Sequence, residues 1–215
     1  MTESKRAEAA QLLAPEHRLL SGFGTDFQVL LFPFNMPSTG HRKTGPEGIE
    51  IVLIEDNSID ASIILNVIEV SKYKCTPVVK TNGIDALNHL RNASDSTIAE
   101  RTLVLLDLVL PGMSGLDFLA QLRQEPRVKA VPVVILTAST KPGHILAAAE
   151  HKVVSYMTKP ASLKQFNMLA KALDELLGAL FSPPIVRASA GKVPSIGPTF
   201  IGQSNERLTG NPELR

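Results

Sequence analysis

The sequence has one cysteine and almost no net charge, and each scarcity excludes a class of protein. Cys75 alone cannot form an internal disulfide or a zinc site built from several cysteines, and it fits a reducing compartment, so we expect a cytoplasmic protein. Lys and Arg number 22 against 21 Asp and Glu, which leaves no field to attract nucleic acid or an anionic membrane. Apolar residues 29–34 are interrupted by Pro33 and fall far short of the roughly 20 residues of a membrane span.

The middle of the chain alternates strand-like and helical patterns. Apolar runs predict strands at 49–54, 76–80, 102–107, 131–137 and 154–158, and amphipathic patterns predict helices at 59–70, 84–92, 114–124, 142–152 and 162–180. Strict alternation of this kind is typical of a parallel sheet with helices on both faces. The sequence therefore predicts an α/β fold, a doubly wound (βα)5 unit, over residues 48–181.

The two ends differ from this middle part in composition. Residues 182–215 hold five Pro, four Gly and four Ser in 34 residues with no apolar periodicity, which predicts a disordered tail. Residues 1–47 combine a helical pattern broken at Pro15 with a linker-like stretch, so this extension is also expected to be flexible. Met36 offers an internal start, and a chain beginning there is expected to keep the melting temperature of the full chain.

Acidic residues follow two of the predicted strands. Five βα units most often adopt the strand order 2-1-3-4-5, and ligands then bind beyond the carboxyl ends of the first and third strands. Glu55 and Asp56 end the first strand and Asp107 ends the third, so three carboxylates converge. Such a cluster repels itself unless a cation lies among its members, and an all-oxygen site without His or Cys suits Mg²⁺ or Mn²⁺.

The ends of the fourth and fifth strands add a hydroxyl and an amine, from Thr137 and Lys159. A carboxylate, a metal, a hydroxyl and a lysine around one point can together hold a phosphoryl group, with Asp107 as the nucleophile that forms an acyl phosphate. Each group alone has a plainer explanation. An acidic pair before a helix capped by Asn57 or Ser58 is helix-start chemistry, and an Asp before a turn is turn chemistry. Compatible groups at four strand ends favour the phosphoryl-binding site over these plainer explanations.

These motifs together resemble the receiver domain of two-component response regulators. The resemblance rests on "EDN" at 55–57, "LLDLVLPGMSG" around Asp107, "LTAS" at Thr137 and "YMTKP" at Lys159, and covers about residues 50–181. It implies a flavodoxin-like sheet in which Asp107 accepts phosphate from a histidine kinase. It also implies the following roles: Mg²⁺ bound by Asp56, Asp107 and the Val109 carbonyl, with Glu55 acting largely through water; phosphoryl oxygens held by Thr137, the Ala138 amide and Lys159; and Tyr156 changing rotamer together with Thr137.

Among receivers, the chain looks most like the small regulators that partner phytochrome-type kinases. The long connection "NASDSTIAERT" and the helix start "PASLKQF" carry this likeness, whereas Ser114 and "EHKVVSY" depart from common receiver patterns. The expected function is a phosphoacceptor in a phosphorelay that acts through protein contacts and is not an enzyme, apart from slow self-dephosphorylation. Val109 and Ser139 occupy the positions with which receivers tune hydrolysis, and they predict a long-lived phosphate.

A homodimer through the fourth helix, the fifth strand and the fifth helix is a further expectation. In the order 2-1-3-4-5 the fifth strand is an edge, and "VVSYMT" carries no charge to discourage pairing. Leu163, Leu177 and Phe181 add apolar residues beyond the core-facing stripe of the last helix. Regulators of the phytochrome-partner group often pair through this face.

Other functions remain open at this stage. A flavodoxin-like cofactor binder needs a phosphate-cradling loop after the first strand, where this chain has "EDNSID". A haloacid dehalogenase-type phosphatase needs an acid two residues after its nucleophile, where Val109 stands. A receiver fold used as a docking module without phosphorylation is the remaining alternative. The histidines His89, His144 and His151 are expected at solvent-facing helix positions.

Overall fold

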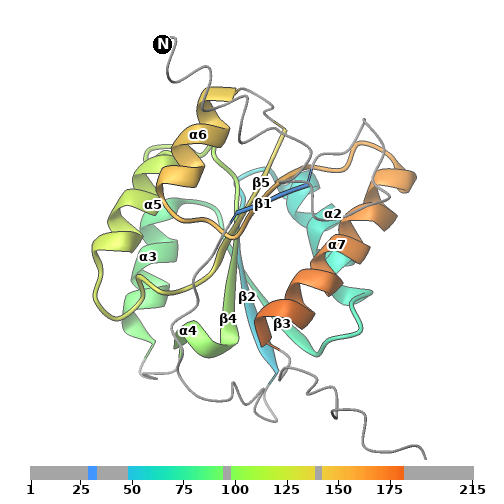
Figure 1. Cartoon of the computed structure of the whole chain (residues 1–215), viewed down its shortest axis with the longest axis horizontal. Coiled ribbons are helices and arrows are strands. Elements are labelled where there is room, and N and C mark those ends of the chain that lie inside the picture. Colours follow the sequence, from blue (N-terminus) through green and yellow to red (C-terminus); the bar gives the residue numbers. More distant parts are fainter. Residues whose placement is uncertain (1–28, 33–47, 94–97, 139–141, 182–215) are drawn as a thin grey trace, which may run out of the picture. The chain divides into compact units, whose positions relative to one another are not determined.

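A computed structural model describes residues 29–32, 48–93, 98–138 and 142–181. All described residues belong to one unit of the chain, and residues 182–215, where the disordered tail is predicted, lie outside the described residues. A central sheet lies between two layers of helices (Figure 1). Its strands are β1 (Val29–Leu31), β2 (Ile49–Ile54), β3 (Cys75–Lys80), β4 (Thr102–Leu106), β5 (Val133–Thr137) and β6 (Ser155–Thr158). The helices are α2 (Ser58–Glu69), α3 (Gly83–Asn92), α4 (Ile98–Arg101), α5 (Gly115–Gln124), α6 (Pro142–Glu150) and α7 (Leu163–Phe181).

The sheet has the order β1-β6-β5-β4-β2-β3. Strands β2 to β6 are parallel and are the five strands predicted from the sequence, so the doubly wound fold and its 2-1-3-4-5 order are confirmed. The switch point lies between β2 and β4, whose pairing runs from Glu50 opposite Thr102 to Ile54 opposite Leu106. The carboxyl ends of these two strands therefore meet at one place.

Strand β1 was not predicted, and it corrects two expectations. Val29–Leu31 pairs antiparallel with β6, so the prediction that the fifth parallel strand is a sheet edge is wrong. The apolar residues 29–31 pair with β6 because the edge of β6 carries no charged side chain that would discourage pairing. A chain beginning at Met36 would lose this strand, and we now expect it to melt at a lower temperature than the full chain.

The prediction that the last helix carries apolar residues beyond its core-facing stripe is also largely wrong. Leu177 and Phe181 are fully buried in the core that α7 forms with α2 and the sheet, and only Leu163, at 76% exposure, remains on the surface. Helix α7 buries more positions than a single stripe predicts, because it packs on the sheet and also beside α2.

Two apolar layers enclose the sheet. One lies under α2 and α7 and includes Ile51, Leu53 and Leu103; the other lies under α3, α5 and α6 and includes Val52, Val104 and Phe118. Successive strand residues thus face opposite layers, which is why the strands read as continuous apolar runs. Within the described residues, no helix is both long and apolar enough to cross a membrane.

Candidate functional site

Three carboxylates converge where β2 and β4 end. Side-chain oxygens of Glu55, Asp56 and Asp107 all lie within 4.8 Å of one another, as the strand order predicts. Glu55 and Asp107 are buried, at 2% and 6% exposure, whereas Asp56 is exposed to solvent. The cluster is therefore a shallow acidic site with two members set into the protein and one at its mouth.

Lys159, directly after β6, reaches into this cluster. Its Nζ lies 2.6 Å from Glu55 Oε2, 2.8 Å from Asp60 Oδ2 and 2.6 Å from Asp107 Oδ2. The Lys159 backbone N–H donates to the Thr137 carbonyl at 3.0 Å, which ties the lysine to the end of β5. One ammonium thus offsets part of the repulsion among the acids.

The pKa values of the buried groups follow from this arrangement. Burial raises the pKa of Glu55, although the hydrogen bond and positive charge of Lys159 act in the opposite direction. Burial alone would lower the pKa of Lys159, but its hydrogen bonds to Asp107, Asp60 and Glu55 outweigh that effect and leave the pKa above its ordinary value. Lys159 is therefore a permanent cation at neutral pH.

Local backbone structure fixes the acids in place. Asn57 caps α2 by accepting from the N–H groups of Ile59 and Asp60, and its own N–H donates to Glu55 Oε1 at 3.2 Å. The Val109 N–H donates to Asp107 Oδ1 at 3.2 Å, and Gly112 turns the following loop with φ of +73°. A side chain on Gly115 would lie 2.5 Å from the Asp107 carbonyl oxygen, so glycine lets α5 begin close behind the acid.

The donors present fit a divalent cation that prefers oxygen. Carboxylates from Glu55, Asp56 and Asp107 offer hard ligands, and no His or Cys belongs to this cluster. Because Asp56 is exposed, a cation can reach the cluster from solvent. Lys159 contacts Glu55 Oε2 and Asp107 Oδ2, so a cation bound there would share these two carboxylates with the ammonium.

The other predicted site residues differ in how buried they are. Thr137 ends β5 and is buried, and Ala138 follows it at the surface. The Val109 side chain is 66% exposed beside the acids. Tyr156 is fully buried in the core between β5 and β1. Ser139 lies outside the described residues.

Asp60 was missed as a member of the site. It lies in the first turn of α2, where an acid favours the helix dipole, yet its Oδ2 also lies 2.8 Å from Lys159 Nζ. Its position in the first turn of α2, shortly after Glu55 and Asp56, is the signal that was available. Lys159 therefore has three carboxylate partners.

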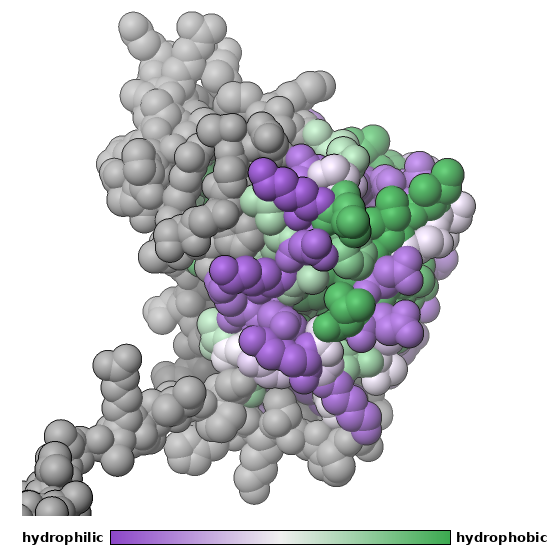
Figure 2. Space-filling view, turned by 90° about the vertical axis from the view of Figure 1, so that its right-hand side faces the viewer, coloured by the Kyte–Doolittle hydropathy of each residue, from purple (hydrophilic) through white to green (hydrophobic). Residues whose placement is uncertain are grey.

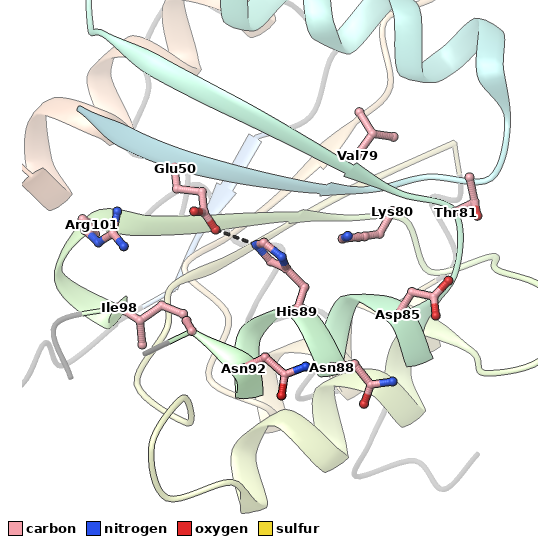
Figure 3. A pocket seen from close by; sticks show the side chains of 11 residues that line it. Glu50, Val79, Lys80, Thr81, Asp85, Asn88, His89, Asn92, Ile98 and Arg101 are labelled. Atoms are coloured by element: carbon pink, nitrogen blue, oxygen red, sulfur yellow. Dashed lines mark hydrogen bonds and ion pairs between the residues drawn. The ribbon is translucent and has the colours of Figure 1, made fainter. Parts of the chain in front are cut away.

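A separate groove of about 720 Å³ lies between α3, α4 and the edge of the sheet (Figure 3). Its lining is polar and includes Lys80, Asp85 and Arg101. His89 Nε2 lies 2.9 Å from Glu50 Oε1 across the groove, and both side chains are mostly buried. His89 is partly exposed where it lines this groove, and it pairs there with a carboxylate that was not expected.

A parallel sheet that gathers three carboxylates and a lysine at its switch point defines a class of phosphoryl-accepting signalling modules. The family model described as "Response regulator receiver domain" matches residues 51–171, which is more than half of the chain. The chain belongs to the response regulator receiver domain family.

Individual relatives agree with this assignment. The chain is 30% identical to the response regulator Rcp1 of Synechocystis over 125 residues, 58% of this chain and 85% of that protein. The crystal structure of the phosphorylated cyanobacterial phytochrome response regulator RcpA matches 61% of this chain and 93% of its own, at 29% identity and a TM-score of 0.52. A receiver domain from Rhodospirillum rubrum matches 63% of this chain and 97% of its own, at 30% identity and a TM-score of 0.55. The chain is thus similar to receivers associated with phytochromes.

Proposed function

We propose that this chain accepts a phosphoryl group on Asp107 from a histidine kinase and passes the signal on through protein contacts. The observation that carries the proposal is the position of Asp107, whose Oδ2 lies 2.6 Å from Lys159 Nζ within a cluster of three carboxylates. Asp107 is buried but borders the exposed Val109 and Asp56, so a phosphodonor can approach it. A docking module that works without phosphorylation would have no use for this arrangement.

The chemistry is a transfer between two nucleophiles. A carboxylate oxygen of Asp107 bonds to phosphorus as the bond between phosphorus and the kinase histidine nitrogen breaks, and the leaving imidazole takes up a proton. The Thr137 hydroxyl, the Ala138 N–H and the Lys159 ammonium are the donors we assign to the phosphoryl oxygens. The product is an aspartyl phosphate.

We assign a divalent cation, Mg²⁺ or Mn²⁺, to Glu55, Asp56, Asp107 and the Val109 carbonyl. When bound, the cation offsets the negative charge that the incoming phosphoryl group adds to the carboxylates. Glu55 and Asp107 are already held by hydrogen bonds from the Asn57 and Val109 N–H groups, so the ligands need little rearrangement.

Self-dephosphorylation should be slow. Val109 has no polar side-chain atom with which to orient water, and its exposed side chain stands beside Asp107. We assign to Ser139, as to Val109, a role in setting the rate of this hydrolysis. The chain is therefore proposed as a phosphoacceptor whose hydrolytic activity only resets the signal.

The proposed donor is a phytochrome-type histidine kinase. The support is the likeness to RcpA, a phytochrome response regulator, at 29% identity over most of that protein. Exposed apolar side chains of Ile59 and Leu163 start α2 and α7, next to the acidic cluster, and offer a docking surface. Figure 2 looks onto the side of the α2 and α7 helices and shows apolar side chains exposed among polar ones. The cytoplasm is the compartment proposed for this transfer, on the family membership and the single cysteine.

The homodimer through α6, β6 and α7 stays a prediction, and the structure weakens its support. Strand β1 covers the edge of β6, and Leu177 and Phe181 are buried. Pairing of two copies along β6 would require β1 to leave.

Acetyl phosphate with Mg²⁺, followed by intact mass, tests the proposed function. The wild-type chain should gain one phosphoryl group, whereas Asp107→Asn should gain none and should stay folded, since the substitution is nearly isosteric and removes one of the clustered acids. Glu69→Gln, an exposed position at the end of α2, is the matched control and should label normally. Labelling of Asp107→Asn, or of the wild type in excess EDTA, would refute the assignment. Faster transfer from an unrelated histidine kinase than from a phytochrome-type kinase would refute the choice of donor.

A further inference from the structure

Strand β1 is bound to β6 through backbone and side-chain contacts. Val29, Leu30 and Leu31 lie opposite Met157, Tyr156 and Ser155 in an antiparallel ladder. Ser155 Oγ donates to the Leu30 carbonyl at 2.9 Å in a buried position, and the Phe32 N–H donates to the Val154 carbonyl at 3.0 Å. A segment from the N-terminal extension thus completes the sheet.

The β1 side chains enter both apolar layers. Leu30 belongs to the same cluster of buried residues as Tyr156, on the side of α3, α5 and α6. Val29 joins the opposite cluster together with Met157 and residues of α7. Both side chains are buried, so the packing of β6 depends on β1 being docked.

Strand β6 also connects directly to the acidic site. Tyr156 lies opposite Ile135 of β5 on one side and opposite Leu30 of β1 on the other. Lys159 lies three residues beyond Tyr156. Its ammonium forms an ion pair with Asp107, and its backbone N–H donates a hydrogen bond to the Thr137 carbonyl. One short strand therefore contacts the proposed phosphoryl-binding groups at its end and β1 along its edge.

Building on the proposed function, we propose that β1 is a phosphorylation-sensitive cap on β6, docked while Asp107 is free and released when Asp107 carries a phosphoryl group. A phosphoryl group on Asp107 gives Lys159 and Thr137 new oxygen partners, and the shift of these residues changes the packing of Tyr156 against Leu30. Strand β1 has three residues, and short edge strands open more easily than central ones. Release exposes an uncharged edge from Val153 to Thr158.

Thermodynamic linkage gives the proposal a second consequence. If phosphorylation weakens the docking of β1, then weakening the docking must favour the phosphorylated state by the same factor. Leu30→Ala, which removes the side chain that packs with Tyr156, should therefore tighten the equilibrium binding of beryllofluoride, an analogue of the phosphoryl group, in the presence of Mg²⁺. Leu31→Ala is the matched control, because Leu31 is only half-buried and packs in the opposite layer.

Hydrogen exchange of the Phe32 amide, followed by NMR in the full chain with Mg²⁺, tests the cap. Adding beryllofluoride, an analogue of the phosphoryl group, should speed this exchange several-fold while the Val104 amide, which donates to the Pro132 carbonyl in the central sheet, keeps its rate. Leu30→Ala should speed exchange of the Phe32 amide without beryllofluoride, and Leu31→Ala should have a smaller effect.

Intact mass after acetyl phosphate treatment separates the possible failures. A chain that gains a phosphoryl group, yet shows unchanged Phe32 exchange with beryllofluoride, would overturn the cap and leave the proposed function standing. A chain that gains none would overturn both, because the cap would have no input. Weaker binding of beryllofluoride by Leu30→Ala than by the wild type would also overturn the cap.

Discussion

Replacing Lys159 by Met should destabilise the fold strongly. The Lys159 ammonium lies 2.6, 2.8 and 2.6 Å from oxygens of Glu55, Asp60 and Asp107, and the lysine side chain is 11% exposed. Removing one partner of a buried ion pair costs roughly 3–5 kcal/mol. The Asp60 side chain is 35% exposed and can regain water, so we expect a loss near the lower end, about 3 kcal/mol. At about 2–4 °C per kcal/mol, the melting temperature should fall by roughly 6–12 °C.

Urea unfolding at pH 7 without divalent cations measures this loss against a surface control. Lys171→Met removes an exposed lysine that lies 3.8 Å from Glu175 on the same helix, and should cost less than about 0.5 kcal/mol. Adding Asp107→Asn to Lys159→Met should recover part of the loss, because one of the unpaired acids is then neutral. Equal stability of the Lys159→Met and Lys171→Met chains, or a further loss in the double variant, would refute the role given to the ammonium.

Three further predictions concern other parts of the fold and site. Arg123, whose pKa burial lowers to about 10, donates to four backbone carbonyls at 2.8–3.3 Å, so Arg123→Met should lower the free energy of unfolding by about 2–4 kcal/mol in urea titrations. Gly115→Ala should lower the melting temperature and the rate of phosphorylation because a Cβ would lie 2.5 Å from the Asp107 carbonyl oxygen, whereas Gly143→Ala, with no atom within 4 Å, should be neutral or stabilising. Val109→Asn should speed loss of the phosphoryl group, and an unchanged or slower decay by mass spectrometry would contradict the role of Val109 in shielding the phosphate.

The sheet and the acidic cluster were predictable because local sequence determines them. Strands buried on both faces read as apolar runs, and in a parallel sheet the carboxyl ends of adjacent strands meet at a known place. Glu55, Asp56 and Asp107 could therefore be brought together before any distance was known, and the structure confirms their convergence.

The parts that were missed depend on contacts between distant segments. Strand β1 pairs with residues more than 120 positions away, and nothing local in "VLL" distinguishes a strand from a short apolar stretch of linker. The burial of Leu177 likewise depends on how α7 packs beside α2. Asp60 joins the site through the reach of Lys159, a long side chain whose direction the sequence does not specify.

Location of the phosphoryl group on the chain tests the central claim most directly. After treatment with acetyl phosphate and Mg²⁺, sodium borohydride reduces an aspartyl phosphate to homoserine, and peptide mass spectrometry then identifies the modified residue. The proposed function predicts homoserine at position 107 alone, and none in the Asp107→Asn chain. Homoserine at Asp56 or Asp60, or an unmodified Asp107 in a chain that has gained phosphate, would contradict it.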